Sequence, residues 1–325
     1  MSFPDIPAVT VDNNNGAIFS SLTEVSIKGC QNLTSLELLL QPAYVPAIRN
    51  IKIKDCASVR SVEINSVGDP TSLEELKVVS CPNLTHLLAP SLAIVELYHC
   101  DHMASIELQK WSLPALRKLM IYSCGSLTSI RESKQTSTDR SHGWASNGTG
   151  KFPLLTDLFV YCQKLETLDD LLTQEYLPAI KKITFRHCDL LSLPTERFGA
   201  FHFLEDLSIY DCPRLKWQSG IGLLPCSLKV LRLRDDCGDI SVLIPGCLQD
   251  LTSLETLDMR SCKGIVSVPG DLWGNLKSLK TLMIQNFPDL VSIGGPTAIA
   301  NINKVLIKNC WKLKEIEQPL CRGFR

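Results

Sequence analysis

Residues 72–87 read SLEELKVVSCPNLTHL, and the spacing of their apolar side chains decides the fold. Leu76 and Val78 alternate with other residues, Cys81 follows three positions later, and two leucines come after it at three-residue intervals. Alternate residues of a strand point to opposite faces, so Leu76 and Val78 face the same side. The stretch therefore predicts a short strand with one buried face, followed by a turn that brings the chain back over the same core.

The same unit recurs along the chain as S-L-x-x-L-x-I-x-x-C-x-x-L-x-x-L, and we count twelve copies. Successive anchor positions lie 19 to 38 residues apart, and most of them lie 23 to 26 apart. A period of this length is typical of leucine-rich repeats. One such unit cannot bury its apolar edge alone, so the stable form is a stack of units. The anchors are Cys30, Cys56, Cys81, Cys100, Cys124, Cys162, Cys188, Cys212, Cys237, Cys262, Phe287 and Cys310.

These observations predict an α/β-type solenoid, a leucine-rich-repeat horseshoe. Its parallel inner sheet has about twelve short strands, and its convex side is mostly irregular or short-helical, because Pro194, Pro245 and Pro269 each stand where a proline can open a helical turn. We expect a single solenoid over residues 1–325, with repeats from about 20 to 318. Residues 132–150 are rich in Ser, Thr and Gly and are expected to form a mobile insertion loop. Neither end carries a polar capping unit, so we expect a piece of a longer polypeptide or a truncated gene product.

The cysteines occur as a column rather than as metal-ligand pairs. Eleven of the fourteen occupy the same repeat position, and no C-x-x-C pair occurs. Phe287 fills that position in one copy and could not bind a metal. The pattern predicts a packing role and no metal site. Cys162 comes one residue early and Cys237 one residue late, which marks two irregular copies. A ladder of unpaired thiols suits a reducing compartment, so we expect a cytoplasmic protein.

Charge and motifs exclude several function classes. The chain has 33 Lys and Arg against 34 Asp and Glu, a net charge of −1, which gives no bulk attraction to nucleic acid. No export signal and no run of 18 apolar residues is present, so neither secretion nor membrane spanning is supported. A phosphate loop, a G-x-S-x-G elbow and an H-E-x-x-H helix are all missing. We therefore predict a protein that is not an enzyme, without catalytic residues or cofactor.

The strand positions that point out of the core are where binding chemistry is expected. Four of the six tyrosines fall there, in copies four to eight. The same positions hold nine basic residues against Glu96 and Asp258, a local excess of seven that favours an acidic protein partner. Two plainer interpretations stay open: the rings cover one another across strands, and the basic face is merely solvated. The predicted partner-binding residues on the concave face are Tyr98, Met120, Tyr122, Phe159, Tyr161, Arg186, Tyr210, Arg232, Arg234 and Arg260.

A neighbouring row, just after the first Leu of each copy, nearly alternates in sign. Arg49 precedes Glu74 by one copy, and Glu205 with Asp206 precedes Lys229. Such alternation predicts ion pairs across adjacent strands, which contribute only a few tenths of a kcal/mol each. We interpret this row as serving register and solubility.

The unit L-P-x-L-x-x-L-x-I-x-x-C-x-x-L-x-x-L-P, nearly complete at residues 113–130 and 254–269, resembles the cytoplasmic leucine-rich repeats of plant nucleotide-binding disease-resistance receptors, the NLR class. The resemblance implies a sensor region that recognises a pathogen effector or a modified host protein and helps to hold the receptor inactive. It also implies contact with an upstream nucleotide-binding domain of the same receptor. In such receptors the inner face is the usual recognition surface, which points to Tyr98, Tyr122, Phe159, Tyr161, Tyr210, Arg232 and Arg234.

A leucine-rich-repeat substrate adaptor of the F-box type, or another protein-binding scaffold, is the alternative. Adaptors of that type use repeats that look like C-x-x-I-T-D-x-G-L, and no T-D-x-G-L occurs in this chain. Extracellular receptor kinases fit less well, because their N-x-L-x-G-x-I-P signature is missing.

Overall fold

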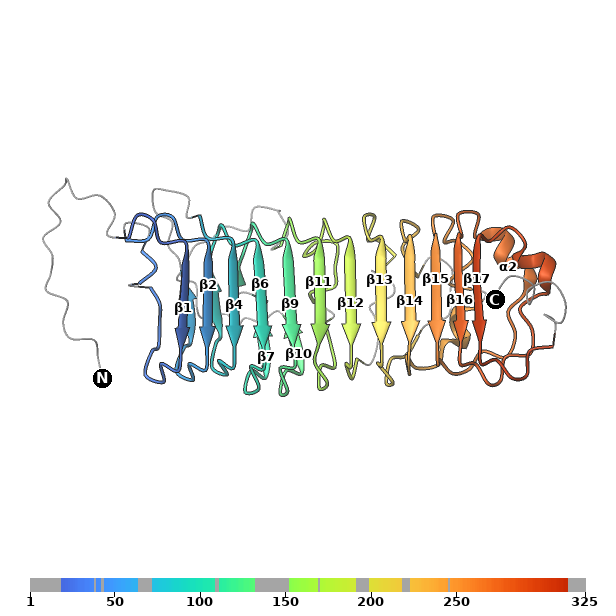
Figure 1. Cartoon of the computed structure of the whole chain (residues 1–325), viewed down its shortest axis with the longest axis horizontal. Helices are drawn as coiled ribbons and strands as arrows, with labels where there is room; N and C mark the ends of the chain where they lie inside the picture. Colours follow the sequence, from blue (N-terminus) through green and yellow to red (C-terminus); the bar gives the residue numbers. More distant parts are fainter. Residues whose placement is uncertain are drawn as a thin grey trace, which may run out of the picture. The chain divides into compact units, whose positions relative to one another are not determined.

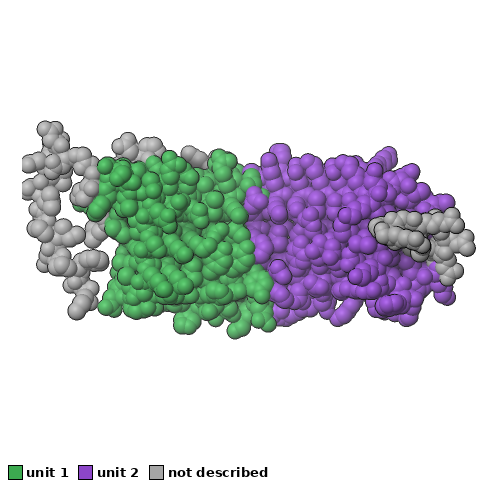
Figure 2. Space-filling view, viewed as in Figure 1, with its two compact units in different colours: residues 1–156, 161–165, 175–177 green, residues 157–160, 166–174, 178–325 purple. Residues whose placement is uncertain are grey.

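The computed structural model describes residues 19–37, 39–41, 44–63, 72–108, 111–131, 152–168, 170–190, 199–217, 223–244 and 246–314. The chain divides into two compact units (Figure 2). Unit 1 comprises residues 1–156, 161–165 and 175–177, and unit 2 comprises residues 157–160, 166–174 and 178–325. The expected insertion loop at 132–150 lies outside the described residues. The single solenoid domain stays a prediction.

Twelve strands of five residues each form one parallel sheet, which we call the long sheet (Figure 1). This confirms the predicted parallel sheet of about twelve short strands. In sheet order the strands are β1 (Glu24–Lys28), β2 (Asn50–Lys54), β4 (Glu75–Val79), β6 (Ile94–Tyr98), β9 (Lys118–Tyr122), β11 (Asp157–Tyr161), β12 (Lys182–Arg186), β13 (Asp206–Tyr210), β14 (Val230–Arg234), β15 (Thr256–Arg260), β16 (Thr281–Gln285) and β17 (Lys304–Lys308).

The second and fourth residues of the long strands form the core from β2 to β16, and they are half-buried in β1 and β17. In β4 these are Leu76 and Val78, both fully buried. The register pairs equivalent residues of successive copies, so Leu76 lies opposite Ile51 on one side and Val95 on the other. Every repeat therefore contributes to the same two apolar columns. This is why one copy alone would leave its core exposed.

A residue in the left-handed conformation follows nearly every long strand. After β2 this is Asp55, with φ of 54°, and after β16 it is Asn286, with φ of 59°. That conformation is costly for most L-residues, and Gly, Asn and Asp adopt it most readily. Strand β11 is followed directly by Cys162, because the sixth copy lacks this residue, as the sequence indicates. The left-handed residues outside glycine are Asp55, Ser80, His99, Ser123, His187, Asp211, Asp235, Ser261, Asn286 and Asn309.

The cysteine column is buried from Cys56 to Cys262, which confirms its packing role, whereas Cys30 is exposed and Cys310 is half-buried in the first and last copies. Most of these thiols reach a strand carbonyl: Cys56 Sγ donates to the carbonyl oxygen of Lys54 over 3.2 Å, and Cys81 Sγ to that of Val79 over 3.4 Å. Burial raises the pKa of the Cys81 thiol to about 11. Both irregular copies keep their cysteine in the core, since Cys162 and Cys237 are 0% exposed.

The return segments between the long strands differ in the two units. In unit 1 they pair into small parallel sheets, which the sequence pattern does not predict. In unit 2 they hold short helices and turns, and Pro269 precedes α2 as expected, whereas Pro194 and Pro245 fall outside the described residues. The elements are β3 (Ser61–Glu63), β5 (His86–Leu88), β8 (Trp111–Ser112), β7 (Ser105–Glu107) and β10 (Ser129–Arg131) in unit 1, and η2 (Ile240–Leu243), α2 (Gly270–Asn275) and η3 (Pro296–Ile299) in unit 2. No helix among the described residues has the length and apolarity needed to cross a bilayer.

Candidate functional site on the long sheet

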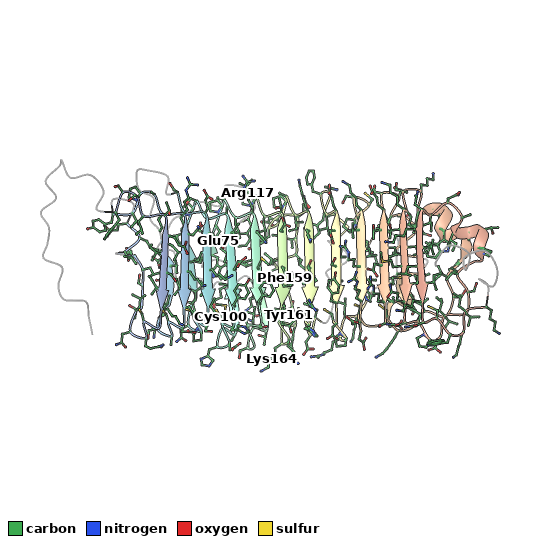
Figure 3. All side chains as sticks on the ribbon, viewed as in Figure 1. Glu75, Cys100, Arg117, Phe159, Tyr161 and Lys164 are labelled. Atoms are coloured by element: carbon green, nitrogen blue, oxygen red, sulfur yellow. The ribbon has the colours of Figure 1, made fainter. Side chains whose placement is uncertain are left out.

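The outward-pointing side chains of the long sheet alternate with the buried ones, and we call them the sheet face. All ten predicted partner-binding residues lie on it, at the third or fifth position of a long strand. Phe159 and Tyr161 on β11 are labelled in Figure 3. Tyr98, Met120, Tyr122 and Tyr161 belong to unit 1, and Phe159, Arg186, Tyr210, Arg232, Arg234 and Arg260 belong to unit 2.

In unit 1 the sheet face carries a stacked pair of tyrosines. The Tyr98 and Tyr122 rings lie opposite each other on β6 and β9, with centroids 4.7 Å apart and planes 3° apart. The Lys77 ammonium lies 4.6 Å from the centroid of the Tyr98 ring. Because the two tyrosines occupy equivalent positions of neighbouring strands, stacking keeps their rings parallel. The pair therefore forms a rigid apolar surface that carries the two tyrosine hydroxyls at its edge.

Glu96 ties this cluster together. Its carboxylate accepts hydrogen bonds from Lys77 Nζ at 2.9 Å and from the Tyr98 hydroxyl at 3.1 Å. The hydrogen bond to Glu96 raises the pKa of Lys77. Burial raises the pKa of Glu96, but the bonds from Lys77 and Tyr98 outweigh burial and leave the pKa below its usual value. Both groups therefore stay charged around neutral pH.

Three lysines at the β1 and β2 end of the sheet face contrast with Lys77. Lys28 lies directly opposite Lys54, and Lys52 lies directly opposite Lys77. Among the described residues, Lys28, Lys52 and Lys54 make no ion pair. Like charges on opposed positions of adjacent strands repel. This end of unit 1 is therefore a positive patch without its own counter-charges.

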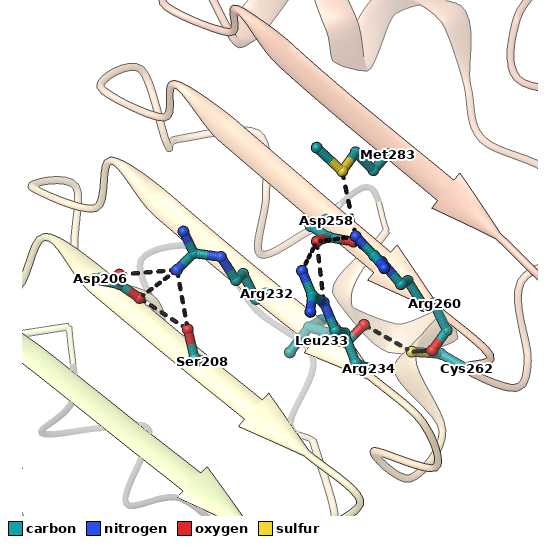
Figure 4. A network of polar contacts seen from close by, with 9 residues as sticks. All are labelled: Asp206, Ser208, Arg232, Leu233, Arg234, Asp258, Arg260, Cys262 and Met283. Carbon is teal, nitrogen blue, oxygen red and sulfur yellow. Dashed lines mark hydrogen bonds and ion pairs between the residues drawn. The ribbon is translucent and has the colours of Figure 1, made fainter. Parts of the chain in front are cut away.

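In unit 2 three arginines of the sheet face are held by carboxylates (Figure 4). Arg232 Nη1 donates to both oxygens of Asp206, at 3.0 and 2.9 Å. The same nitrogen donates to Ser208 Oγ at 3.3 Å, and Ser208 in turn donates to Asp206 at 2.9 Å. Ser208 is 2% exposed, so its hydroxyl is satisfied inside this network.

Asp258 holds two further arginines. Arg260 Nε donates to Asp258 Oδ1 at 2.8 Å and its Nη2 to Oδ2 at 3.0 Å. Arg234 Nε donates to Oδ2 at 3.0 Å and also forms an ion pair with that oxygen. The hydrogen bonds to Asp258 raise the pKa of Arg260. Arg234 also lies 5.5 Å from the centroid of the Tyr210 ring.

These networks revise the expected charge of the sheet face. By its position in the repeat Asp206 belongs to the row that sets register, but in the structure its carboxylate contacts Arg232. Lys77, Arg232, Arg234 and Arg260 are all ion-paired. Asp206 joins Glu96 and Asp258 as a third carboxylate, so the excess of the nine basic residues falls from seven to six, and four of those nine are already in ion pairs. The pairing that the sequence pattern does not reveal is diagonal. Asp206 stands two positions before Ser208, the residue opposite Arg232. Asp258 stands two positions before Arg260, the residue opposite Arg234.

The expected cross-strand ion pairs of the neighbouring row are confirmed. Arg49 contacts Glu74 at 3.4 Å, Lys229 contacts Glu205 at 3.0 Å, and Lys280 contacts Glu255 at 2.9 Å. Their side chains are well exposed, so these pairs fix register more than they stabilise the fold.

Unit 2 also has a hollow of about 410 Å³ on its sheet face. A Phe and a Tyr ring, the hydroxyls of one Thr and one Ser, three cations and one carboxylate line it. Its lining residues are Phe159, Lys182, Thr184, Arg186, Asp206, Ser208, Tyr210 and Arg232. It brings together four of the predicted partner-binding residues and adds two functional candidates, Thr184 and Ser208, that the aromatic and charge patterns do not indicate.

The chemistry of the sheet face is that of a binding surface. It offers ring faces, guanidinium groups and hydroxyls, and in the described part of the chain no group of His, Cys, Asp and Glu is arranged to hold a metal ion. Ionised side chains held by opposite charges offer hydrogen-bond donors and acceptors in fixed positions to a partner. Such groups are poorly suited to general acid–base catalysis, because they do not readily gain or lose a proton.

No protein-family model matches the chain, and no curated protein matches it. Among solved structures, the chain is similar to the leucine-rich repeat domain of the type III effector XopL, at 23% identity over 70% of this chain and 71% of that chain, with a TM-score of 0.47. It is also similar to TLR13 in a complex with ssRNA13, at 14% identity over 89% of this chain and 54% of that chain, with a TM-score of 0.32. A leucine-rich cell surface protein from Faecalibacterium prausnitzii matches at 14% identity over 90% and 82%, with a TM-score of 0.18.

The fold itself rests on the chain's own repeats. Each copy contributes one strand to a parallel sheet in a fixed register, and each copy between the first and the last also contributes two buried apolar positions and one buried anchor. Leucine-rich-repeat domains are generally protein-binding scaffolds without catalytic activity. The chain is a leucine-rich-repeat solenoid.

Proposed function

We propose that this solenoid recognises an acidic protein partner through its sheet face. The observation that carries the proposal is the stacked pair of Tyr98 and Tyr122, fixed by Lys77 and Glu96. Large aromatic side chains are the most frequent energetic anchors of protein interfaces. A ring already held in place loses little conformational entropy when a partner binds.

Charge supports the acidic character of the partner. Lys28, Lys52 and Lys54 face solvent with no ion pair among the described residues, and Lys28 and Lys54 oppose each other. An acidic surface would relieve this repulsion as it docks, and a patch of one sign speeds the approach of an oppositely charged partner. Of the basic residues on the sheet face without an ion pair among the described residues, three lie at the β1 and β2 end of unit 1, Arg186 lies in the hollow of unit 2, and Lys308 lies on β17.

We further propose that the chain is the recognition region of a plant intracellular immune receptor of the NLR class. Support for this comes from the repeat consensus at residues 113–130 and 254–269. In that role it senses a pathogen effector or a modified host protein and contributes to autoinhibition. The buried, unpaired cysteines fit a reducing compartment, which supports a cytoplasmic location.

A selection from a displayed protein library on the immobilised chain tests the binding proposal. We expect the selected binders to be acidic, and the Tyr98→Ala/Tyr122→Ala variant to bind them at least about 30-fold more weakly, which corresponds to about 2 kcal/mol. The Phe203→Ala variant removes an exposed ring away from the sheet face and serves as the matched control. Binders that do not distinguish the double variant from the wild type would contradict the proposal.

The coding sequence upstream of Met1 tests the receptor class separately. A nucleotide-binding module encoded there is the expected result. An F-box segment in that position would instead support the substrate-adaptor alternative.

A further inference from the structure

We propose that the hollow in unit 2 is the seat for one carboxylate side chain, a Glu or Asp of the acidic partner, with Arg186 and Thr184 as its ligands. The inference rests on the proposed function and names the chemistry that this part of the sheet face recognises. Three of the lining residues, Lys182, Arg186 and Arg232, are cations, and Asp206 is the single carboxylate, which leaves two net positive charges.

Arg186 is the guanidinium of this hollow that is left to bind a ligand. Arg232 is occupied by Asp206 and Ser208. Arg186, by contrast, has no carboxylate partner among the described residues, and its side chain is exposed. Its guanidinium carbon lies 6.0 Å from the centroid of the Tyr210 ring on the neighbouring strand. The ring supports the guanidinium from the side and leaves its donor edge for an acceptor.

Thr184 supplies the second, independent observation. It is 7% exposed, lines the hollow, and its hydroxyl makes no hydrogen bond within the described part of the chain. Ser208, directly opposite on β13, uses its own hydroxyl to join Asp206 and Arg232. Solvent still reaches the Thr184 hydroxyl, because Gln174 Oε1 is the one fully buried side-chain oxygen or nitrogen of the described residues that lacks a partner. A carboxylate oxygen seated in the hollow would accept the hydrogen bond that Thr184 has to give.

The number of donors favours a carboxylate over a phosphate group. The Arg186 fork matches the two oxygens of one carboxylate, and Thr184 adds a third bond. The Lys182 ammonium already lies 3.9 Å from Asp206, and Asp206 would repel a dianion more strongly than a monoanion. Phe159 and Tyr210 add ring surface against which the methylene groups of a Glu or Asp side chain could pack.

Fluorescence anisotropy with fluorescein-labelled hexaglutamate at low salt tests this seat on the full chain. We expect Arg186→Gln to weaken binding about tenfold and Thr184→Val about threefold, while Thr184→Ser keeps wild-type affinity because it keeps the hydroxyl. Arg214→Gln removes the same charge from an exposed arginine that does not line the hollow, and it should change affinity less than twofold. Thermal unfolding of each variant checks the fold.

Equal affinity of the wild type and Arg186→Gln, or equal losses for Arg186→Gln and Arg214→Gln, would overturn the inference. A hexaphosphoserine peptide serves as the comparison. If it binds at least tenfold more tightly than hexaglutamate and its binding depends on Arg186, the ligand of the hollow is a phosphate and the carboxylate assignment is wrong. Failure of this seat is distinguishable from failure of the proposed function. If library binders depend on Tyr98 and Tyr122 but hexaglutamate binding does not depend on Arg186, the proposed function is still supported and only the carboxylate site fails.

Discussion

Arg260 binds Asp258 through two hydrogen bonds, at 2.8 and 3.0 Å, although Asp258 is only 1% exposed. The same carboxylate accepts Arg234 from the neighbouring strand. Arg234 and Arg260 lie directly opposite each other in the sheet, so their charges would repel without it. Asp258 is thus a buried acid that allows two arginines to occupy adjacent positions of the sheet face.

Replacing Asp258 tests this arrangement. We expect Asp258→Asn to lower the free energy of unfolding by about 1 to 3 kcal/mol, because both guanidinium groups lose their counter-charge. The loss stays below that of a fully buried pair, since the arginine side chains keep 29% and 31% exposure to water. Asp289→Asn, which breaks an exposed pair with Lys312, is the control and should cost less than about 1 kcal/mol. Urea unfolding of both variants measures the difference, and equal losses would refute the role of Asp258.

Most of the fold follows from the sequence because the repeat fixes it locally. Two alternating apolar residues and one anchor per copy determine the strands and the buried column, and even the missing residue before Cys162 is visible in the spacing. The small sheets of unit 1 were not predictable in this way. Strand β8 covers only Trp111 and Ser112, and β3 and β5 cover three residues each, which is too short to show an alternating pattern.

The sequence predicts which residues lie on the sheet face, but it does not predict which of them contact one another. The sequence places Tyr98 and Tyr122 on the same face, and the stacking follows from register. The partner of Arg232 was missed, because Asp206 belongs to a row in which neighbours such as Glu205 and Lys229 pair with each other. Long side chains reach diagonally across a parallel sheet, and the choice between a direct and a diagonal partner depends on rotamers that spacing does not encode.

The core of the stacked repeats should be intolerant of truncation. Leu119 on β9 is 2% exposed, and we expect Leu119→Ala to destabilise the protein by roughly 2 to 5 kcal/mol through lost burial and a residual cavity. Phe203→Ala removes a larger side chain that is 58% exposed and should cost much less. Denaturant unfolding measures the two losses of stability as shifts of the midpoint, provided that the dependence of the unfolding free energy on denaturant concentration is unchanged. A smaller effect at position 119 than at position 203 would contradict the assignment of Leu119 to the core.

Alkaline pH should weaken the fold through the cysteine column. The pKa of Cys81 is raised from 9.0 to about 11, so this thiol favours folding fully below pH 9. Between pH 9 and 11 the unfolded chain loses the proton first, and the stabilisation declines by up to about 1.4 kcal/mol per pH unit. The Cys81→Ala variant should therefore show a shallower decline over this window, measured by urea unfolding under reducing conditions. Cys226→Ala, which removes an exposed thiol, is the control; identical slopes for all three proteins would exclude the effect.

Residue-resolved alkylation of the native protein tests the stacked column most directly. Mass spectrometry after brief iodoacetamide treatment should find Cys30 and Cys226 labelled, because both are exposed. The anchor thiols of the stacked copies should react only after denaturation. Rapid labelling of several of them in the folded protein would contradict the account, since each would then lie outside the core. The protected anchors are Cys56, Cys81, Cys100, Cys124, Cys162, Cys188, Cys212, Cys237 and Cys262.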